Sequence, residues 1–205
     1  GIPIIAIDTG VSGAEVTSFV ATDNYAVAKV QGAVAATLVN DGDTVIYVTG
    51  NQAQSTGQER RNGFMEAFSA ARPGSKILEV PTEWNSQQAQ EGVEAVLNSN
   101  SDVKMVVNAW DGGTMGAKAA LENLGYGAGD VKLVGFDGAS DAIAAMDEGW
   151  VHADTAQMLY QMGYQGIKAA AAAARGETVS SRIDTGFFLV TPSTSGVYKK
   201  MVGIN

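Results

Sequence analysis

Residues Thr44–Val48 read TVIYV, a short run of β-branched and aromatic side chains that is typical of a buried strand. A helical pattern follows over residues 58–71, and a second strand-like run follows that over residues 76–80. Strand, helix and strand in this order predict a βαβ unit with two parallel strands.

The same alternation continues toward both ends of the chain, which predicts an α/β fold built on doubly wound parallel sheets. Strands are expected over residues 2–8, 18–21, 44–48, 76–80, 103–108, 132–136, 152–156 and 186–189. Helices are expected over residues 25–39, 58–71, 86–97, 114–124, 140–147 and 159–174.

The composition excludes several classes of function. The 205 residues are 45% hydrophobic and 17% charged, as in an ordinary globular protein. Acidic residues outnumber basic ones by 22 to 13, and this excess repels phosphate backbones, so no nucleic-acid partner is expected. The chain has no cysteine and only one histidine, His152, so we expect neither a thiolate site nor a site with several histidines for a metal.

Two nucleotide-binding motifs fail on inspection. No G-x-G-x-x-G lies between the first strand and helix, which argues against a bound dinucleotide. The stretch GGTMGAK at residues 112–118 has the glycines of a phosphate-binding loop, but no glycine precedes its lysine and no Ser or Thr follows it. We therefore predict no cofactor and no phosphate hydrolysis.

Polar and aromatic residues gather where the predicted strands end, which is where open α/β sheets bind ligands. These loops cover residues 8–9, 49–60, 81–85, 109–113 and 137–140. Hydroxyl groups of a sugar need charged or amide partners, and its C–H faces need a flat apolar surface. The candidate ligand-binding residues are Asp8, Arg60, Trp84, Trp110, Asp111, Asp137 and Gln157.

Plainer interpretations stay open for these residues. Each aspartate could be a loop residue or a helix cap, and each indole a packing residue. Asp8 together with Asp111 or Asp137 could also serve acid–base chemistry in a glycosidase or isomerase. Arg60 could be a solvated residue on the surface, but the helix dipole disfavours a cation near a helix start unless a partner lies nearby.

Seven strings spread over the chain resemble the periplasmic sugar-binding proteins of the ribose-binding type, which serve ATP-driven importers. The strings are GIPIIAID at 1–8, ATDN at 21–24, ERRNGF at 59–64, TEWN at 82–85, NAWD at 108–111, VGFDG at 134–138 and ADTAQ at 153–157. Each string alone is weak evidence, but seven in the right order and spacing are strong evidence.

The resemblance implies roles for individual residues. Asp8 would bind from the first lobe, Arg60 would supply a guanidinium and Asp137 a carboxylate. Trp84 would stack on the ligand with Trp110 as a second plate, and Gln157 would be the amide at the hinge. Thr9 stands where the family usually has arginine, and Trp110 where it has asparagine, so a sugar or polyol other than ribose is expected.

The resemblance also implies two lobes joined by three crossings. Residues 1–24 and 157–187 would form part of the N-terminal lobe, and residues 25–156 and 188–205 the C-terminal lobe. About a hundred residues of the first lobe would be absent. Residues 2–7 and helix 159–174 would then expose apolar faces, and we expect the N-terminal part of the same protein to cover them.

The expected function is that of a periplasmic or extracytoplasmic solute-binding protein that is not an enzyme. It would capture a sugar or polyol and deliver it to the membrane permease of an ABC importer. The alternative is the effector-binding core of a lactose-repressor-type transcription regulator, whose helix-turn-helix would precede this segment. The acidity of the chain favours transport.

Overall fold

The computed structural model describes residues 1–204, and its strands and helices alternate along the chain as predicted. Its strands are β1 (Ile5–Ile7), β2 (Ser18–Ala21), β3 (Thr44–Val48), β4 (Lys76–Val80), β5 (Val103–Asn108), β6 (Lys132–Asp137), β7 (Val151–Gln157), β8 (Arg182–Asp184) and β9 (Phe187–Val190). Its helices are α1 (Asn24–Leu38), α2 (Ser55–Ala71), α3 (Ser86–Ser99), α4 (Asp111–Asn123), α5 (Ser140–Asp147), α6 (Leu159–Ala174) and α7 (Ser195–Val202). Asn205, which the sequence places in the C-terminal lobe, lies outside the described residues.

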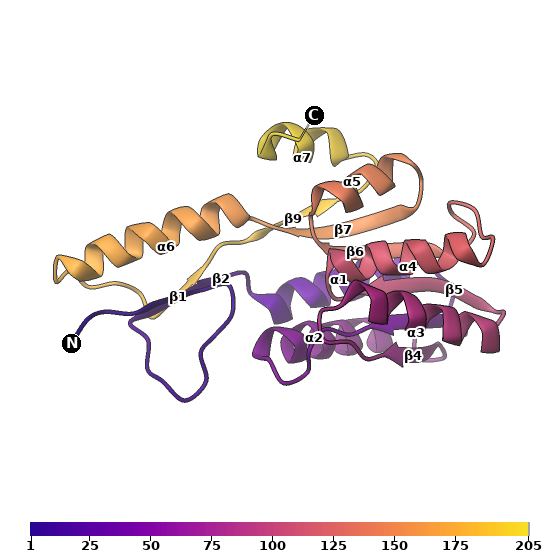
Figure 1. Cartoon of the computed structure of the whole chain (residues 1–205), viewed down its shortest axis with the longest axis horizontal. Coiled ribbons are helices and arrows are strands. Elements are labelled where there is room, and N and C mark those ends of the chain that lie inside the picture. The colour runs from indigo at the N-terminus through magenta and orange to yellow at the C-terminus, as the bar shows by residue number, and fades with distance from the viewer. Residues whose placement is uncertain (205) are drawn as a thin grey trace.

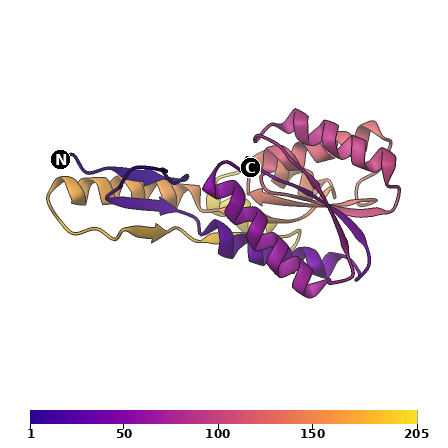
Figure 2. The same ribbon diagram turned by 90° about the horizontal axis from the view of Figure 1, so that it is seen from below.

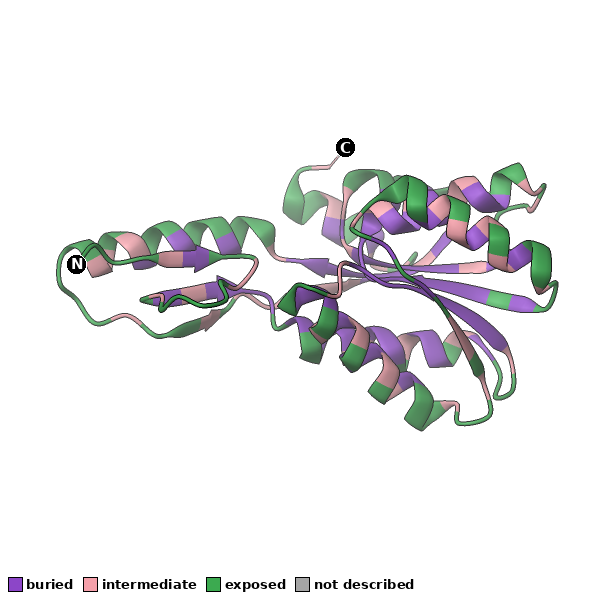
Figure 3. Ribbon diagram, turned by 60° about the horizontal axis from the view of Figure 1, so that its bottom comes forward, coloured by how far each residue is buried: buried purple, intermediate pink, exposed green. Residues whose placement is uncertain are grey.

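Two separate sheets carry these strands. The larger has the order β4-β3-β5-β6-β7-β9 and is parallel except for β9, which runs antiparallel to β7. Helices α1 and α2 cover one of its faces, and α3, α4 and α5 cover the other (Figure 3). The smaller sheet is parallel, with the order β1-β2-β8, and α6 lies along one of its faces (Figures 1 and 2). The predicted α/β class with doubly wound parallel sheets is confirmed.

The chain passes between the two sheets three times. The passages lie between β2 and α1, between β7 and α6, and between β8 and β9. The two parts consequently lie end to end, with α6 and the small sheet extending away from the larger part (Figure 1). Within residues 1–204, no helix combines the length and apolarity needed to cross a membrane.

The core of the larger part is centred on β3, in which every residue is buried. The ring of Tyr47 stacks on that of Phe64 from α2, with centroids 4.3 Å apart and planes 10° apart. Helices α1 and α2 pack closely because Gly63 has no side chain, and a Cβ there would overlap the carbonyl oxygen of Tyr25. This rigid core positions the loops at the carboxyl ends of the strands.

The smaller part has little core of its own. Val20, Met162 and Ala169 are buried, with Ile5 and Ile183 packed against them. The exposed large apolar residues of this part are Ile2, Ile4, Ile7, Val11, Leu159, Tyr160, Tyr164 and Ile167. The prediction that the first strand and the helix over residues 159–174 expose apolar faces is therefore confirmed, as the exposed outer surface of α6 in Figure 3 shows.

The structure corrects three details at the chain ends. The first strand is shorter than the predicted residues 2–8, because residues before Ile5 have no neighbouring strand among residues 1–204, and Ile2 is 91% exposed. Strand β8 was not predicted; it has only three residues and completes the small sheet beside β2. Helix α7 was not predicted either; its eight residues are followed by the C-cap Gly203, whose φ is 77°.

Candidate functional site

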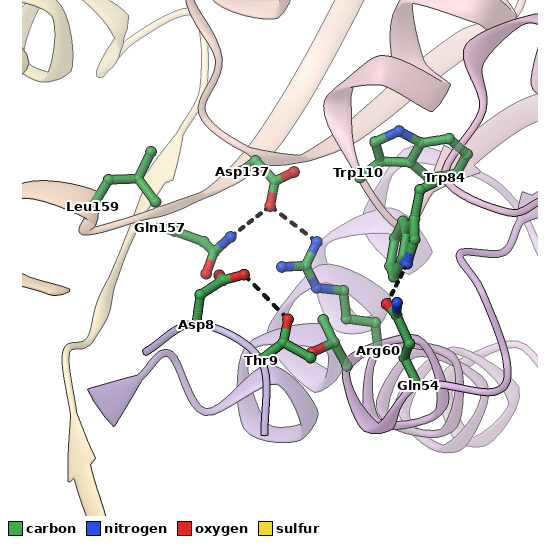
Figure 4. A pocket seen from close by; sticks show the side chains of 10 residues that line it. Asp8, Thr9, Gln54, Arg60, Trp84, Trp110, Asp137, Gln157 and Leu159 are labelled. Atoms are coloured by element: carbon green, nitrogen blue, oxygen red, sulfur yellow. Dashed lines mark hydrogen bonds and ion pairs between the residues drawn. The ribbon is translucent and has the colours of Figure 1, made fainter. Parts of the chain in front are cut away.

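A cavity of about 400 Å³ lies where the strand ends of the two sheets meet (Figure 4). Its lining consists of Asp8, Thr9, Gln54, Thr56, Arg60, Trp84, Trp110, Asp137, Gln157 and Leu159. Six of the seven residues singled out from the sequence therefore line one space. The exception is Asp111, which is described below.

Arg60 lies in the second turn of α2 and is only 3% exposed. Its Nε donates to Oδ1 of Asn24 at 2.8 Å, and its Nη1 donates to the carbonyl oxygen of Ala109 at 2.7 Å. The same Nη1 forms an ion pair of 2.9 Å with Oδ1 of Asp137. The guanidinium carbon lies 3.8 Å from the centroid of the Phe136 ring. These partners hold a buried cation near a helix start that would otherwise disfavour it.

Asp137 is the last residue of β6 and turns its carboxylate into the cavity (Figure 4). Nε2 of Gln157 donates to its Oδ1 at 2.7 Å. Burial raises the pKa of Asp137 above its ordinary value, although Arg60 and Gln157 act to lower it. The φ of Asp137 is 117°, a conformation that side chains rarely adopt, and the fold must therefore hold this backbone in place.

The two indoles meet edge to face. Their ring centroids are 5.3 Å apart and their planes are 89° apart, so the expected sandwich of two facing plates is not the observed geometry. Trp84 is fixed by a hydrogen bond of 2.6 Å from its Nε1 to Oε1 of Gln54. Its ring lies against Gly50, where a Cβ would overlap it. Edge-to-face packing is favourable for aromatic pairs. The guanidinium carbon of Arg60 lies 5.8 Å from the centroid of the Trp84 ring.

Asp8 reaches the cavity from the smaller part. It follows β1, has a positive φ of 72°, and is anchored by a hydrogen bond of 3.0 Å from its N–H to the carbonyl oxygen of Val20. Its carboxylate is exposed and accepts a hydrogen bond of 3.2 Å from Oγ1 of Thr9. Both parts of the fold thus contribute to the same cavity.

Asp111 lies elsewhere than the sequence suggests. It begins α4, is 2% exposed, and is not among the residues that line the cavity. Its Oδ2 accepts a hydrogen bond of 2.7 Å from the N–H of Ala139, two residues after Asp137. Asp111 therefore lies beneath the loop that carries Asp137.

Sequence reasoning missed several contributors to the site. Gln54 and Thr56 line the cavity and fall in the candidate loop 49–60, but neither was singled out. Leu159 lines it from the start of α6 and carried no signal. Asn24 falls in the string ATDN but was not singled out; Asp23 caps α1, whereas Asn24 is buried and accepts a hydrogen bond from Arg60. Within residues 1–204, no group of three or more ligating side chains could hold a metal ion.

The fold and the site define an α/β protein with two sheets and a polar, indole-lined cavity where they meet. The family described as periplasmic binding protein domain matches residues 1–178, and the chain belongs to this family.

Relatives and solved structures agree with that assignment. The chain is 31% identical over 189 residues to the ribose import binding protein RbsB of Escherichia coli, covering 92% of this chain and 63% of the relative. It superimposes with a TM-score of 0.86 on a glycerol-bound ABC transporter solute-binding protein from Mycobacterium smegmatis, at 30% identity over 95% of this chain and 67% of that one. With a myo-inositol-bound counterpart from Bacillus halodurans the TM-score is 0.90, at 27% identity over 98% and 69% of the two chains. The chain thus spans less than two thirds of the length of its curated relatives.

Proposed function

We propose that this chain binds a neutral sugar or polyol in the cavity, as part of a solute-binding protein that delivers it to the permease of an ABC importer. The relatives named above are a ribose import protein and solute-binding proteins with bound glycerol and myo-inositol. These names favour import over the effector-binding core of a transcription repressor. They also support a location outside the cytoplasm.

The observation that carries the proposal is the hydrogen-bonding balance of the cavity wall. Two carboxylates, Asp8 and Asp137, face a single guanidinium, Arg60, two of whose nitrogens are already engaged. Within residues 1–204, Oδ2 of Asp137 and Oε1 of Gln157 accept no hydrogen bond. The wall therefore offers mostly acceptors and a net negative charge, which suits hydroxyl donors and repels anions.

The indoles supply the apolar half of the recognition. Trp84 is half-buried and Trp110 nearly buried, and the Nε1 of Trp84 is already bound to Gln54. The ring face, rather than the N–H, remains for the ligand, and it suits the C–H face of a sugar ring. Because the planes of the two indoles are perpendicular, Trp110 and Trp84 do not form two facing plates around the ligand.

We propose binding without chemical conversion. Oδ1 of Asp137 is occupied by Arg60 and Gln157, and Asp111 is buried behind the cavity wall. Asp8 is an exposed carboxylate from the other part of the fold, and the second carboxylate of the cavity lining, Asp137, is ion-paired with Arg60. A glycosidase or isomerase mechanism needs two free carboxyl groups.

The two parts of the fold are proposed to be two lobes that close on the ligand. Residues 1–24 and 157–187 would belong to the N-terminal lobe, and residues 25–156 with 188–204 to the C-terminal lobe. The apolar surface left exposed on the small sheet and α6 would be covered by a further N-terminal part of the same protein. Gln157 lies at the passage from β7 to α6 and donates a hydrogen bond to Asp137, so closure of the two lobes would be coupled to the position of the Asp137 carboxylate.

Calorimetric titration of the chain with D-ribose, D-allose, D-arabinose, myo-inositol and glycerol tests the proposal, with gluconate as an anionic counterpart. We expect a neutral compound to bind with a dissociation constant near the micromolar range, about −8 kcal/mol, and gluconate not to bind. Asp137→Asn is expected to weaken binding at least tenfold. The matched control, Asp147→Asn, alters a surface ion pair with Lys199 and is expected to leave binding unchanged. Binding of gluconate alone, or conversion of a bound sugar detected by NMR, would contradict the proposal.

A further inference from the structure

A second pair of carboxyl groups lies directly behind the cavity wall. Asp154, in the middle of β7, is fully buried, and neither of its carboxylate oxygens has a hydrogen-bond partner among residues 1–204. A Cβ on Gly135 would overlap Oδ2 of Asp154 and lie 2.6 Å from Oδ1 of Asp111. The two carboxyl groups therefore crowd the same point over a residue that has no side chain.

Two buried carboxylates at one point cannot both be ionised at low cost. Burial raises the pKa of Asp154 to about 7, and burial together with the charge of Asp154 raises the pKa of Asp111 well above its ordinary value. A proton on Asp111 would also supply the donor that Asp154 lacks. The pair therefore keeps at least one proton at neutral pH.

Three other ionisable groups face this pair. Arg60 is the nearby cation and favours ionisation, whereas the carboxylate of Asp137 opposes it. The hydroxyl of Tyr198 has a pKa raised to about 12 by burial and by the surrounding carboxylates, so it stays neutral and donates to the carbonyl oxygen of Gly138 at 2.9 Å.

The pair holds the backbone that presents Asp137. Asp137 has a φ of 117° and Gly138 a φ of 78°. Oδ2 of Asp111 accepts from the N–H of Ala139, while Tyr198 binds the carbonyl oxygen of Gly138. The peptide unit that joins Gly138 to Ala139 is thus held from both sides, which keeps a strained turn in place.

We propose that Asp111 and Asp154 act as a proton-sharing positioning pair that keeps Asp137 directed at the ligand and weakens ligand binding as rising pH removes protons from the pair. The effect on ligand binding rests on the proposed function, whereas the sharing of a proton between the two aspartates does not. Below the transition the pair is largely neutral and holds the turn. Above it, negative charge accumulates behind Asp137 and repels its carboxylate.

Unfolding by urea between pH 5 and pH 8 tests the pair without any ligand. The folded state holds a proton that the unfolded chain releases near pH 4, so the folding equilibrium constant should fall as pH rises from 5 to about 7, by up to about tenfold per pH unit for one proton. Asp154→Asn should remove the part of this pH dependence of the folding equilibrium constant that comes from the proton on Asp154. The slope that remains comes from Asp111, Asp137 and Glu59, because burial raises the pKa of each of these carboxyl groups as well. A matched carboxyl-to-amide control, Glu91→Gln on the exposed face of α3, should keep the full slope.

Calorimetry with D-ribose and myo-inositol between pH 6 and pH 8.5 tests the link to binding. The dissociation constant of the unaltered chain should rise several-fold over this range, whereas that of Asp154→Asn should stay nearly constant. If the folding equilibrium constants of the two chains depend equally on pH, Asp111 and Asp154 do not share a proton. If the affinity of the unaltered chain does not depend on pH, the pair does not position Asp137. If no sugar binds, the proposed function fails while the unfolding data still decide the pair.

Carbon-13 NMR of the aspartate carboxyl groups gives the same answer in the unaltered chain, should Asp154→Asn not fold. An aspartate that titrates near pH 7 supports the pair. Titration of every aspartate below pH 5 would overturn it.

Discussion

Nη1 of Arg60 lies 2.9 Å from Oδ1 of Asp137, and the arginine side chain is almost completely buried. The pair joins the second turn of α2 to the end of β6, so it ties two loops of the cavity wall together. Since Asp137 also accepts from Gln157, one carboxylate oxygen links the larger part of the fold to the passage that leads into α6.

Arg60→Ala is expected to destabilise the protein by about 3 kcal/mol, because it leaves the partly buried carboxylate of Asp137 without its counterion. Urea unfolding measures this change. The matched control is Arg61→Ala, which removes a surface pair with Glu79 and should cost no more than about 1 kcal/mol. Equal losses in the two variants would mean that the buried pair has no special weight.

Gly50→Ala is expected to weaken sugar binding without replacing any polar side chain. The added Cβ would overlap the ring of Trp84, so the indole must leave its place in the cavity wall. Calorimetry should show that the affinity for the sugar falls by about two- to tenfold, which is the order of one lost stacking contact. Gly163→Ala is the control, because a Cβ there meets no atom within 4 Å and the α6 helix should gain about 0.5–1 kcal/mol of stability.

Much of this site could be predicted because its residues follow strands. Trp84, Trp110 and Asp137 stand at strand ends in the sequence, and parallel strands bring those ends to one edge. The place of Asp111 could not be predicted, because its loop position is the same whether the side chain turns outward or beneath the neighbouring loop. The partnership of Asn24 with Arg60 joins residues 36 positions apart and leaves no local pattern.

The fold likewise has elements that the sequence predicts and elements that it does not. Strands such as β3 are fully buried and consist of a continuous run of β-branched and aromatic residues, so their positions can be read from the sequence. Strand β8 has three residues, of which only Ile183 is half-buried, and its pairing with β2 depends on a segment more than 160 positions away. Short, exposed elements of this kind carry too little hydrophobic pattern to be recognised.

Replacing Ile4 and Ile167 together, by Ser and Lys, is expected to reduce the binding of a hydrophobic dye such as bis-ANS. These side chains are 53% and 70% exposed, so their loss should change stability by less than about 1 kcal/mol. Val197→Lys is the control, because Val197 is 61% exposed on α7, away from the small sheet. A similar drop in dye binding for the control would show that the apolar surface of the small sheet and α6 is not special.

A crystal structure of the chain grown with a sugar that binds in calorimetry tests the central claim most directly. We predict electron density for the sugar in the cavity, with one C–H face on Trp84 and hydroxyls within hydrogen-bond distance of Asp137 and Asp8. Density at another surface, or a cavity that stays empty at saturating sugar, would contradict the claim that these two parts of the fold hold the ligand between them.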